Sequence, residues 1–424
     1  MDYRITGSRR STRGLFRTTA AMAVAGVAVV AQLALATSSG ATAPERPGPV
    51  SSHQNTRAGD DTGQHPIPLT TRYHAEMHGS ITRIGNALMT CDETKAPLVK
   101  GVSSCKDAQK GVGTGIYNNN YPMRYINQYP GKFPLPPSEG GGFETLYSSS
   151  GATLNLIPGS TVKYARLYWG GTRGLGKTIL PLTQVDGVLF KTPDGKQYHE
   201  INTDPSYKDL GYMTGVGEGN AMEHGYQASA DVTDLVKASG NGNYIVADMD
   251  SVVANHSWGG WSLVVAYENC DKPLRNIQLS DGFQIELPDS PPISSMVNDI
   301  KVPATGQIAA NLGFIGYDGD RTYTGDTVSV KSTNGPLTVL STPDKPANDF
   351  MNSTISESIP SDEFVRSPSY VNQMGYDSDR IDISKLLRPG DTSLDFTFNT
   401  QKDGYQIGAI FSWVNLEDSS QTNT

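Results

Sequence analysis

The 424-residue sequence contains few cysteines, few tryptophans and few charged residues. It has three cysteines and four tryptophans, and charged residues make up 18% of it, with a formal net charge of −9. Phosphate recognition needs clustered lysine and arginine, and the sequence has no basic patch of that kind, so we expect no nucleic-acid partner. Beyond the N-terminal region, no apolar run is long enough to span a membrane, so we expect no membrane span in the mature chain.

The common catalytic signatures are missing as well. The sequence has no Gly-x-Ser-x-Gly elbow, no P-loop and no dinucleotide fingerprint. The close pair His74 and His78 lacks the His-Glu-x-x-His arrangement of zinc proteases. The paired carboxylates of a glycosidase have no fixed sequence spacing, so a secreted carbohydrate-active hydrolase stays open as an alternative function.

Glycine, proline and tyrosine are abundant, with 45, 26 and 20 residues. This composition favours many short strands joined by turns over long helices, and it predicts an all-β fold. The segment 230–268 follows that pattern, because a capped turn at Asp231 precedes an alternating strand from Tyr244 and a second strand from Trp261.

The same pattern returns near the C-terminus. The turn Asp382-Ile-Ser-Lys-Leu-Leu matches Asp231-Val-Thr-Asp-Leu-Val, and two apolar strands follow it. A duplicated unit of this kind predicts two tandem antiparallel β-sandwich domains of jelly-roll type. We expect the domains at residues 73–270 and 271–418, followed by a polar tail at 419–424.

The N-terminal region predicts export. A basic stretch precedes an apolar run that ends in Ala34-Leu35-Ala36, so residues 1–36 have the form of a secretory signal peptide. The Arg9-Arg10 pair leaves twin-arginine export open beside the general route. Residues 37–72 are rich in proline, glycine, serine and charge, and they predict a disordered linker. We therefore expect a secreted, extracellular protein.

Cysteines in an exported protein meet oxidising conditions. Cys91 and Cys105 share one loop-rich segment and form the favoured disulfide, which leaves Cys270 as a free thiol. Pairing of Cys270 with either of the other two stays open.

Several motifs together resemble a known family: LYWGG, ADVTDLV, GGWSLVVAYE, GYDGDRTYTGD and YVNQMGYDSDRIDIS, over residues 79–418. They resemble the N-terminal all-β module of secreted actinobacterial surface proteins that carry DUF11-type repeats, which are absent here. The resemblance implies export from a Gram-positive cell and a surface module of poorly defined function. A looser resemblance, through the DVTDLV turn, is to galactose-binding-like jelly-roll domains.

Three loops carry candidate binding residues. Asp318, Asp320 and Asp326 put three carboxylates on one strand-end loop, a donor set that suits calcium. The pair Asp377 and Asp379 is a second candidate, and ordinary solvated turns are the alternative for both loops.

The third loop is Gly-rich and contains Asn255, His256 and Trp258. An indole there could stack on a sugar, whereas Trp169 and Trp261 continue strand patterns and are expected in the core. These features favour a secreted or cell-surface binding or structural module without enzymatic activity. Its expected partner is a cell-wall or extracellular glycan, or a protein.

Overall fold

The computed structural model describes residues 63–135, 141–193, 195–216, 222–305, 308–358 and 364–416. The expected signal peptide, the linker up to residue 62 and the tail at 419–424 lie outside these ranges. The end of the expected linker needs a correction, because strand β1 begins at Ile67. Polar residues such as Thr70 and Arg72 hide this strand in the sequence, but Thr70 pairs with Asp281 and Arg72 forms an ion pair with the same residue.

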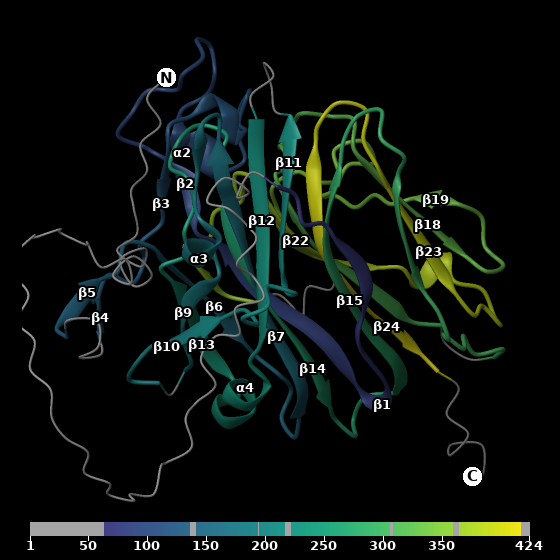
Figure 1. Cartoon of the computed structure of the whole chain (residues 1–424). Helices are drawn as coiled ribbons and strands as arrows, with labels where there is room; N and C mark the ends of the chain where they lie inside the picture. The colour runs from purple at the N-terminus through teal and green to yellow at the C-terminus, as the bar shows by residue number, and fades with distance from the viewer. Residues whose placement is uncertain are drawn as a thin grey trace, which may run out of the picture.

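The prediction of an all-β sandwich fold is confirmed. The described residues form one eleven-stranded central sheet, two flanking sheets and two short hairpins (Figure 1). The central sheet has, in order, β11 (Leu210–Val216), β12 (Met222–Asp231), β7 (Thr161–Leu175), β14 (Gly259–Glu268), β1 (Ile67–Ala87), β15 (Leu274–Glu286), β24 (Tyr405–Asn415), β17 (Ala310–Tyr317), β22 (Tyr376–Asp382) and β20 (Ile355–Glu357), with β8 (Thr178–Ile179) paired to β7.

The flanking sheets cover the two halves of the central sheet. The first has the order β10 (His199–Asn202), β9 (Gly187–Lys191), β13 (Gly242–Ala247), β6 (Ser149–Leu154) and β21 (Arg366–Ser367). The second has the order β16 (Ile293–Val297), β23 (Leu394–Asn399), β18 (Thr327–Ser332) and β19 (Thr338–Val339). The short hairpins are β2 (Met89–Cys91) with β3 (Met123–Tyr125), and β4 (Lys132–Pro134) with β5 (Phe143–Thr145).

Helical segments are short: α2 (Cys105–Gln109), α3 (Leu182–Val185), α4 (Thr233–Ser239), η2 (Asn118–Asn120) and η6 (Ser384–Leu386). In the part of the chain that the structure describes, no helix has the length and apolarity needed to cross a membrane. The predicted disulfide is present, because Cys91 and Cys105 are bonded, and Cys270 is free and exposed.

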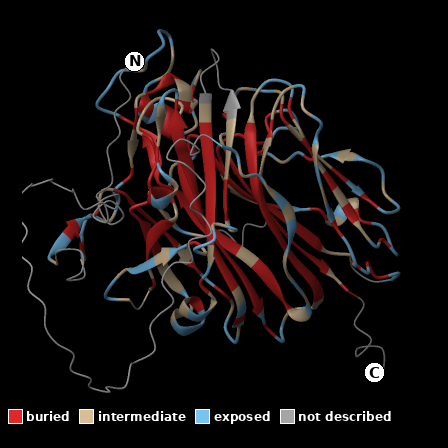
Figure 2. Cartoon of the chain, viewed as in Figure 1, coloured by how far each residue is buried: buried red, intermediate tan, exposed pale blue. Residues whose placement is uncertain are grey.

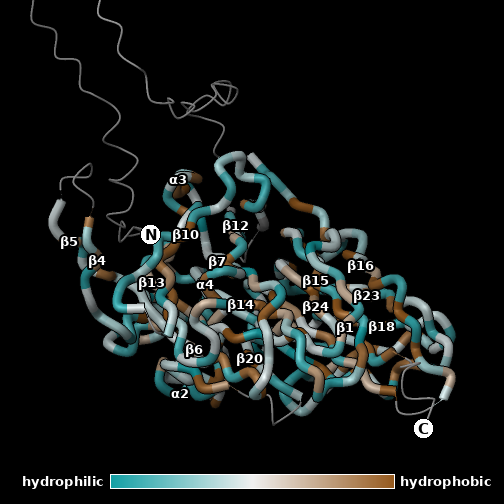
Figure 3. Tube along the Cα trace, turned by 90° about the horizontal axis from the view of Figure 1, so that it is seen from below, coloured by the Kyte–Doolittle hydropathy of each residue, from teal (hydrophilic) through white to brown (hydrophobic). Residues whose placement is uncertain are grey.

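Each flanking sheet encloses a hydrophobic core against its half of the central sheet. The first core draws on β6, β7, β13 and β14, and the second on β17, β18, β23 and β24. In Figure 1 the first flanking sheet lies on the left, the strands of the central sheet run through the middle and the second flanking sheet lies on the right, and the view from below in Figure 3 shows the same succession. Buried residues fill the strands of the inner layers, whereas exposed residues gather on loops (Figure 2).

The two turns on which the predicted repeat depends make the same contacts in both halves. Asp231 accepts a hydrogen bond from the Thr233 amide at 2.8 Å, and Thr233 Oγ1 accepts one from the amide of Ala165 at 2.9 Å. In the second half, Asp382 accepts from the Ser384 amide at 2.9 Å, and Ser384 Oγ accepts from the amide of Ala310 at 3.0 Å. The shared hydroxyl–amide bond explains why serine or threonine stands there in each half.

A third apolar cluster, here called the seam, joins the two halves of the central sheet on the faces turned away from the flanking sheets. Its buried residues include Trp258, Tyr317 and Tyr376. Close approach at the seam requires glycine: a Cβ on Gly260 would lie 2.5 Å from the Tyr376 ring. Because β1 and β15 also pair along their length, one sheet runs through both halves, and the division at residues 270 and 271 into two tandem domains stays a prediction.

Candidate functional site

The structure buries the predicted aromatic ligand. Trp258 is 1% exposed, and its ring stacks on Tyr317 with centroids 5.1 Å apart. Its amide donates to Thr172 Oγ1 at 3.0 Å. The expectation that Trp258 offers a sugar-stacking surface therefore needs a correction, because the indole packs in the seam. Trp169 and Trp261 have no exposed surface and lie in the first core, where the strand pattern placed them.

The other two residues of that loop lie at the end of the seam. His256 has a left-handed backbone, with φ of 67°, and its Nδ1 lies 2.8 Å from Glu223 Oε1. Asn255 is half-buried in the same turn. Glu223 also raises the pKa of Asp318, so the structure brings the predicted loops at 255–258 and 318–326 together through a glutamate that neither motif contains.

Carboxylates crowd this end of the seam. Burial, followed by the charges of Glu223 and Asp320, raises the pKa of Asp318 well above its usual range. Burial and the charges of Asp320, Asp318 and Asp326 likewise raise the pKa of Asp403. The Asp320 amide donates to Asp403 Oδ2 at 2.9 Å, so this carboxylate also holds the loop in place.

Each of the three carboxylates predicted for calcium accepts a hydrogen bond from the protein. Asp318 accepts from Gln406, Asp320 accepts from Asn119, and Asp326 accepts from the Met351 amide. Among the described residues, no group of three or more His, Cys, Asp or Glu side chains is placed to hold a metal ion. The geometry therefore gives the calcium expectation no support. His74 and His78 also form hydrogen bonds with different partners: His74 with the Asn276 side chain and His78 with the Lys272 carbonyl.

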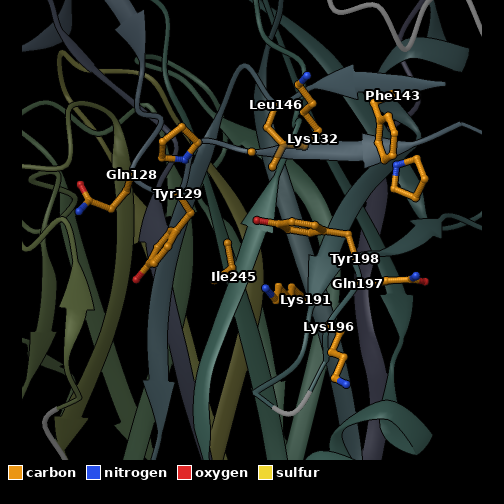
Figure 4. A pocket seen from close by; sticks show the side chains of 13 residues that line it. Gln128, Tyr129, Lys132, Phe143, Leu146, Lys191, Lys196, Gln197, Tyr198 and Ile245 are labelled. Carbon is orange, nitrogen blue, oxygen red and sulfur yellow. The ribbon is translucent and has the colours of Figure 1, made fainter.

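A groove that the sequence did not predict lies outside the first flanking sheet. Its volume is about 620 Å³, in the range of small-ligand sites. It lies between β9, β13 and the β4–β5 hairpin, and Figure 4 shows its labelled side chains around Tyr198. The lining comprises Gln128, Tyr129, Pro130, Gly131, Lys132, Pro134, Phe143, Leu146, Lys191, Lys196, Gln197, Tyr198 and Ile245.

The groove combines aromatic rings with positive charge. Lys191 Nζ lies 5.7 Å from the centroid of the Tyr198 ring, a cation–π arrangement. Lys132 and Lys196 are exposed at its rim. Burial, with smaller contributions from Asp248 and Tyr129, raises the pKa of Tyr198 to about 12, so its hydroxyl stays neutral and can donate a hydrogen bond.

Neighbouring residues position the second tyrosine. The Tyr129 amide donates to Ser149 Oγ at 2.7 Å, and its hydroxyl accepts from Asn243 Nδ2 at 3.3 Å. Its ring fits over Gly151 of β6, where a Cβ would come within 2.8 Å of the hydroxyl. Phe143 on β5 is 66% exposed. The sequence signal for this groove is weak, because its aromatics and lysines come from segments far apart in the chain.

Comparison with known proteins identifies no family. No family model matches the sequence, and no curated protein matches it. Among solved structures, the major capsid protein P2 of bacteriophage PM2 matches at 14% identity and a TM-score of 0.18, over 64% of this chain and 98% of that one. PNGase F, a glycosylasparaginase of Flavobacterium meningosepticum, matches at 14% identity and a TM-score of 0.19, over 68% and 94%. At these scores neither likeness carries an argument.

Proposed function

We propose that the protein is a secreted, non-enzymatic binding module that recognises an acidic glycan in the groove around Tyr129 and Tyr198. The observation that carries the proposal is the juxtaposition of these rings with Lys132, Lys191 and Lys196. Tyrosine offers an apolar face to a sugar ring and a polar hydroxyl to its substituents. Lysine ammonium groups pair with carboxylate or phosphate groups on the same glycan.

Charge complementarity favours an anionic ligand. The protein carries a net charge of −9, yet three of the residues that line the groove are lysines and none of those described is acidic. The missing carboxylates also favour binding over hydrolysis, because glycoside hydrolysis uses a pair of carboxyl groups flanking the bond. The carboxylates of the seam do not line this groove.

Extracellular placement is part of the same proposal. The predicted signal peptide at residues 1–36 supports it, and so does the disulfide between Cys91 and Cys105, since disulfides persist in oxidising compartments. The tandem arrangement belongs here too. Both halves use the same strand order, with β12, β7, β14 and β1 in the first corresponding to β22, β17, β24 and β15 in the second, which supports an internal duplication.

A binding assay with paired polysaccharides tests the function. We expect the protein to bind an acidic polysaccharide, such as a polyuronate, and to bind a neutral glucan more weakly. Tyr198→Ala should weaken binding about tenfold through the lost ring face, and Lys191→Ala should weaken it and flatten its salt dependence.

Matched controls lie in the second half of the chain. Tyr370→Ala removes another half-buried tyrosine, and Lys331→Ala removes an exposed lysine on β18, so both should bind as the unaltered protein does. Equal binding of charged and neutral polysaccharides, or equal losses in the groove variants and the controls, would show that the groove is not the site.

A further inference from the structure

A lysine with no exposed surface lies between two aspartates in the second half of the molecule. Lys345 precedes β20, and its Nζ is 2.6 Å from Asp377 Oδ1 and 2.7 Å from Asp379 Oδ2. All three side chains are fully buried. Asp377 and Asp379 are two residues apart on β22, so both carboxyl groups project from the same face of the strand.

The surroundings exclude water from this triad. The ring of Phe350 lies 5.9 Å from Lys345 Nζ, and Phe350 belongs to the second core. One ammonium cannot neutralise two buried carboxylates, and a surplus charge away from water is costly. Burial, opposed by the charge of Lys345, raises the pKa of Asp379 to about 6 and also raises that of Asp377. A proton on one carboxyl group removes the surplus charge.

The hydrogen bonds give the two carboxyl groups different roles. Asp377 is held on both oxygens: Oδ1 accepts from Lys345 and from the Thr354 amide at 3.1 Å, and Oδ2 accepts from the Ser353 amide at 3.0 Å. These donors favour its ionised form. Asp379 Oδ2 lies 2.7 Å from Lys345 Nζ, its ion-pair partner.

The other oxygen of Asp379 has two donors of its own. Its Oδ1 accepts from the Ser356 amide at 3.1 Å and from the Ser356 hydroxyl at 2.7 Å. Two donors on one oxygen would stabilise negative charge that develops there when a nucleophile adds to the carboxyl carbon. Asp379 is therefore placed as an electrophile, and Asp377 as a base.

We propose that Lys345 and Asp379 form an intramolecular amide bond. Asp377 takes a proton from the Lys345 ammonium, and the free amine adds to Cγ of protonated Asp379. Asp377 then returns its proton to the departing Oδ2 hydroxyl and accepts one from the nitrogen. The Nζ–Cγ bond forms, the Cγ–Oδ2 bond breaks, and one water molecule leaves.

The reaction changes no oxidation state and needs no co-reactant. Well-oriented intramolecular groups react with effective molarities of roughly 10⁵–10⁸ M, which replaces chemical activation of the acid. Departure of water from a dry core favours the amide. The bond would tie the segment before β20 to β22, and β20 is the last strand at this edge of the central sheet.

Mass spectrometry of the reduced, folded protein tests the bond directly. Trypsin cleaves after Lys331, Arg366 and Arg380, and Pro346 blocks cleavage after Lys345. We expect peptides 332–366 and 367–380 as one linked species, lighter than their sum by one water molecule. Fragmentation around Ser378 assigns the link to Asp379. Two separate peptides of full mass would overturn the proposal, and a link to Asp377 would contradict the assigned roles.

Variants separate the chemistry from mere proximity. Lys345→Met removes the nucleophile, and Asp377→Ala removes the base while keeping the acceptor, so both should yield unlinked peptides. Lys301→Met, which alters an exposed lysine, should keep the link. A link that persists in Asp377→Ala would contradict the role of Asp377. The result from the unaltered protein stands by itself if a buried variant fails to fold.

Discussion

Glu286 is a single buried side chain that makes the stability of the protein depend on pH. It ends β15 with no exposed surface, and its Oε2 accepts from the Ile293 amide at 2.8 Å. Burial raises the pKa of Glu286 to about 7, although hydrogen bonds from the amides of Ile293 and Thr400 lower it. The folded protein therefore holds this proton to a higher pH than the unfolded chain does.

The sign of the pH dependence follows from linkage. Below the unfolded pKa of about 4.5 the proton is bound in both states, and between there and about 7 only the folded state keeps it. The contribution of Glu286 to stability is thus present in acid and lost as the pH rises to 7. We expect the stability of Glu286→Gln, relative to that of the unaltered protein, to be higher at pH 8 than at pH 5. Urea unfolding at the two pH values measures this difference. An identical offset at both pH values would refute this, and the exposed Glu268→Gln serves as the control.

For single residues, the sequence predicted some structural environments correctly and others wrongly. Local patterns predicted the disulfide between Cys91 and Cys105 and the burial of Trp169 and Trp261. Trp258 did not, because a tryptophan in a Gly-rich loop looks exposed until Tyr317 from the other half of the chain covers it. Nothing in the sequence around Lys345 predicted its buried ion pairs, since its partners Asp377 and Asp379 lie on a strand further along the chain.

Among the elements, the two equivalent turns are the best predicted, because their contacts are local. Thr233→Val keeps the shape of the side chain but leaves the buried Ala165 amide without its acceptor, which should cost about 1–3 kcal/mol in the free energy of unfolding. Ser384→Ala should cost a similar amount through Ala310. Urea unfolding measures both.

Thr233→Ser retains the hydroxyl and provides the matched control, so it should stay within about 0.5 kcal/mol of the unaltered protein. An unchanged stability in Thr233→Val would contradict the role of the hydrogen bond, whereas a loss as large in Thr233→Ser would show that packing of the methyl group contributes as much as the hydrogen bond does. Strands around these turns were also predicted from alternation. The pairing of β1 with β15 was not, because residues such as Glu76 and Asn276 are far apart in sequence and no turn links them.

For the whole molecule, the question is whether the halves unfold together. Arg83 on β1 donates to the carbonyls of Ser356 and Ser378, at 2.6 and 2.8 Å, and so ties the first half to the edge of the second. On β1 as well, Arg72 pairs with Asp281 of β15 and with Asp209. Together with the apolar seam, these contacts couple the two cores.

We therefore expect one cooperative transition in calorimetry, with equal van't Hoff and calorimetric enthalpies.

Gly260→Ala tests the seam, because its Cβ would overlap the Tyr376 ring and should lower the free energy of unfolding by about 1–3 kcal/mol. The single transition should move as a whole. Gly131→Ala, whose Cβ would make only an ordinary contact 3.4 Å from Leu146, should leave it in place. Two transitions, of which Gly260→Ala shifts only one, would mean that each half is stabilised by its own core and that the continuous sheet adds little cooperativity.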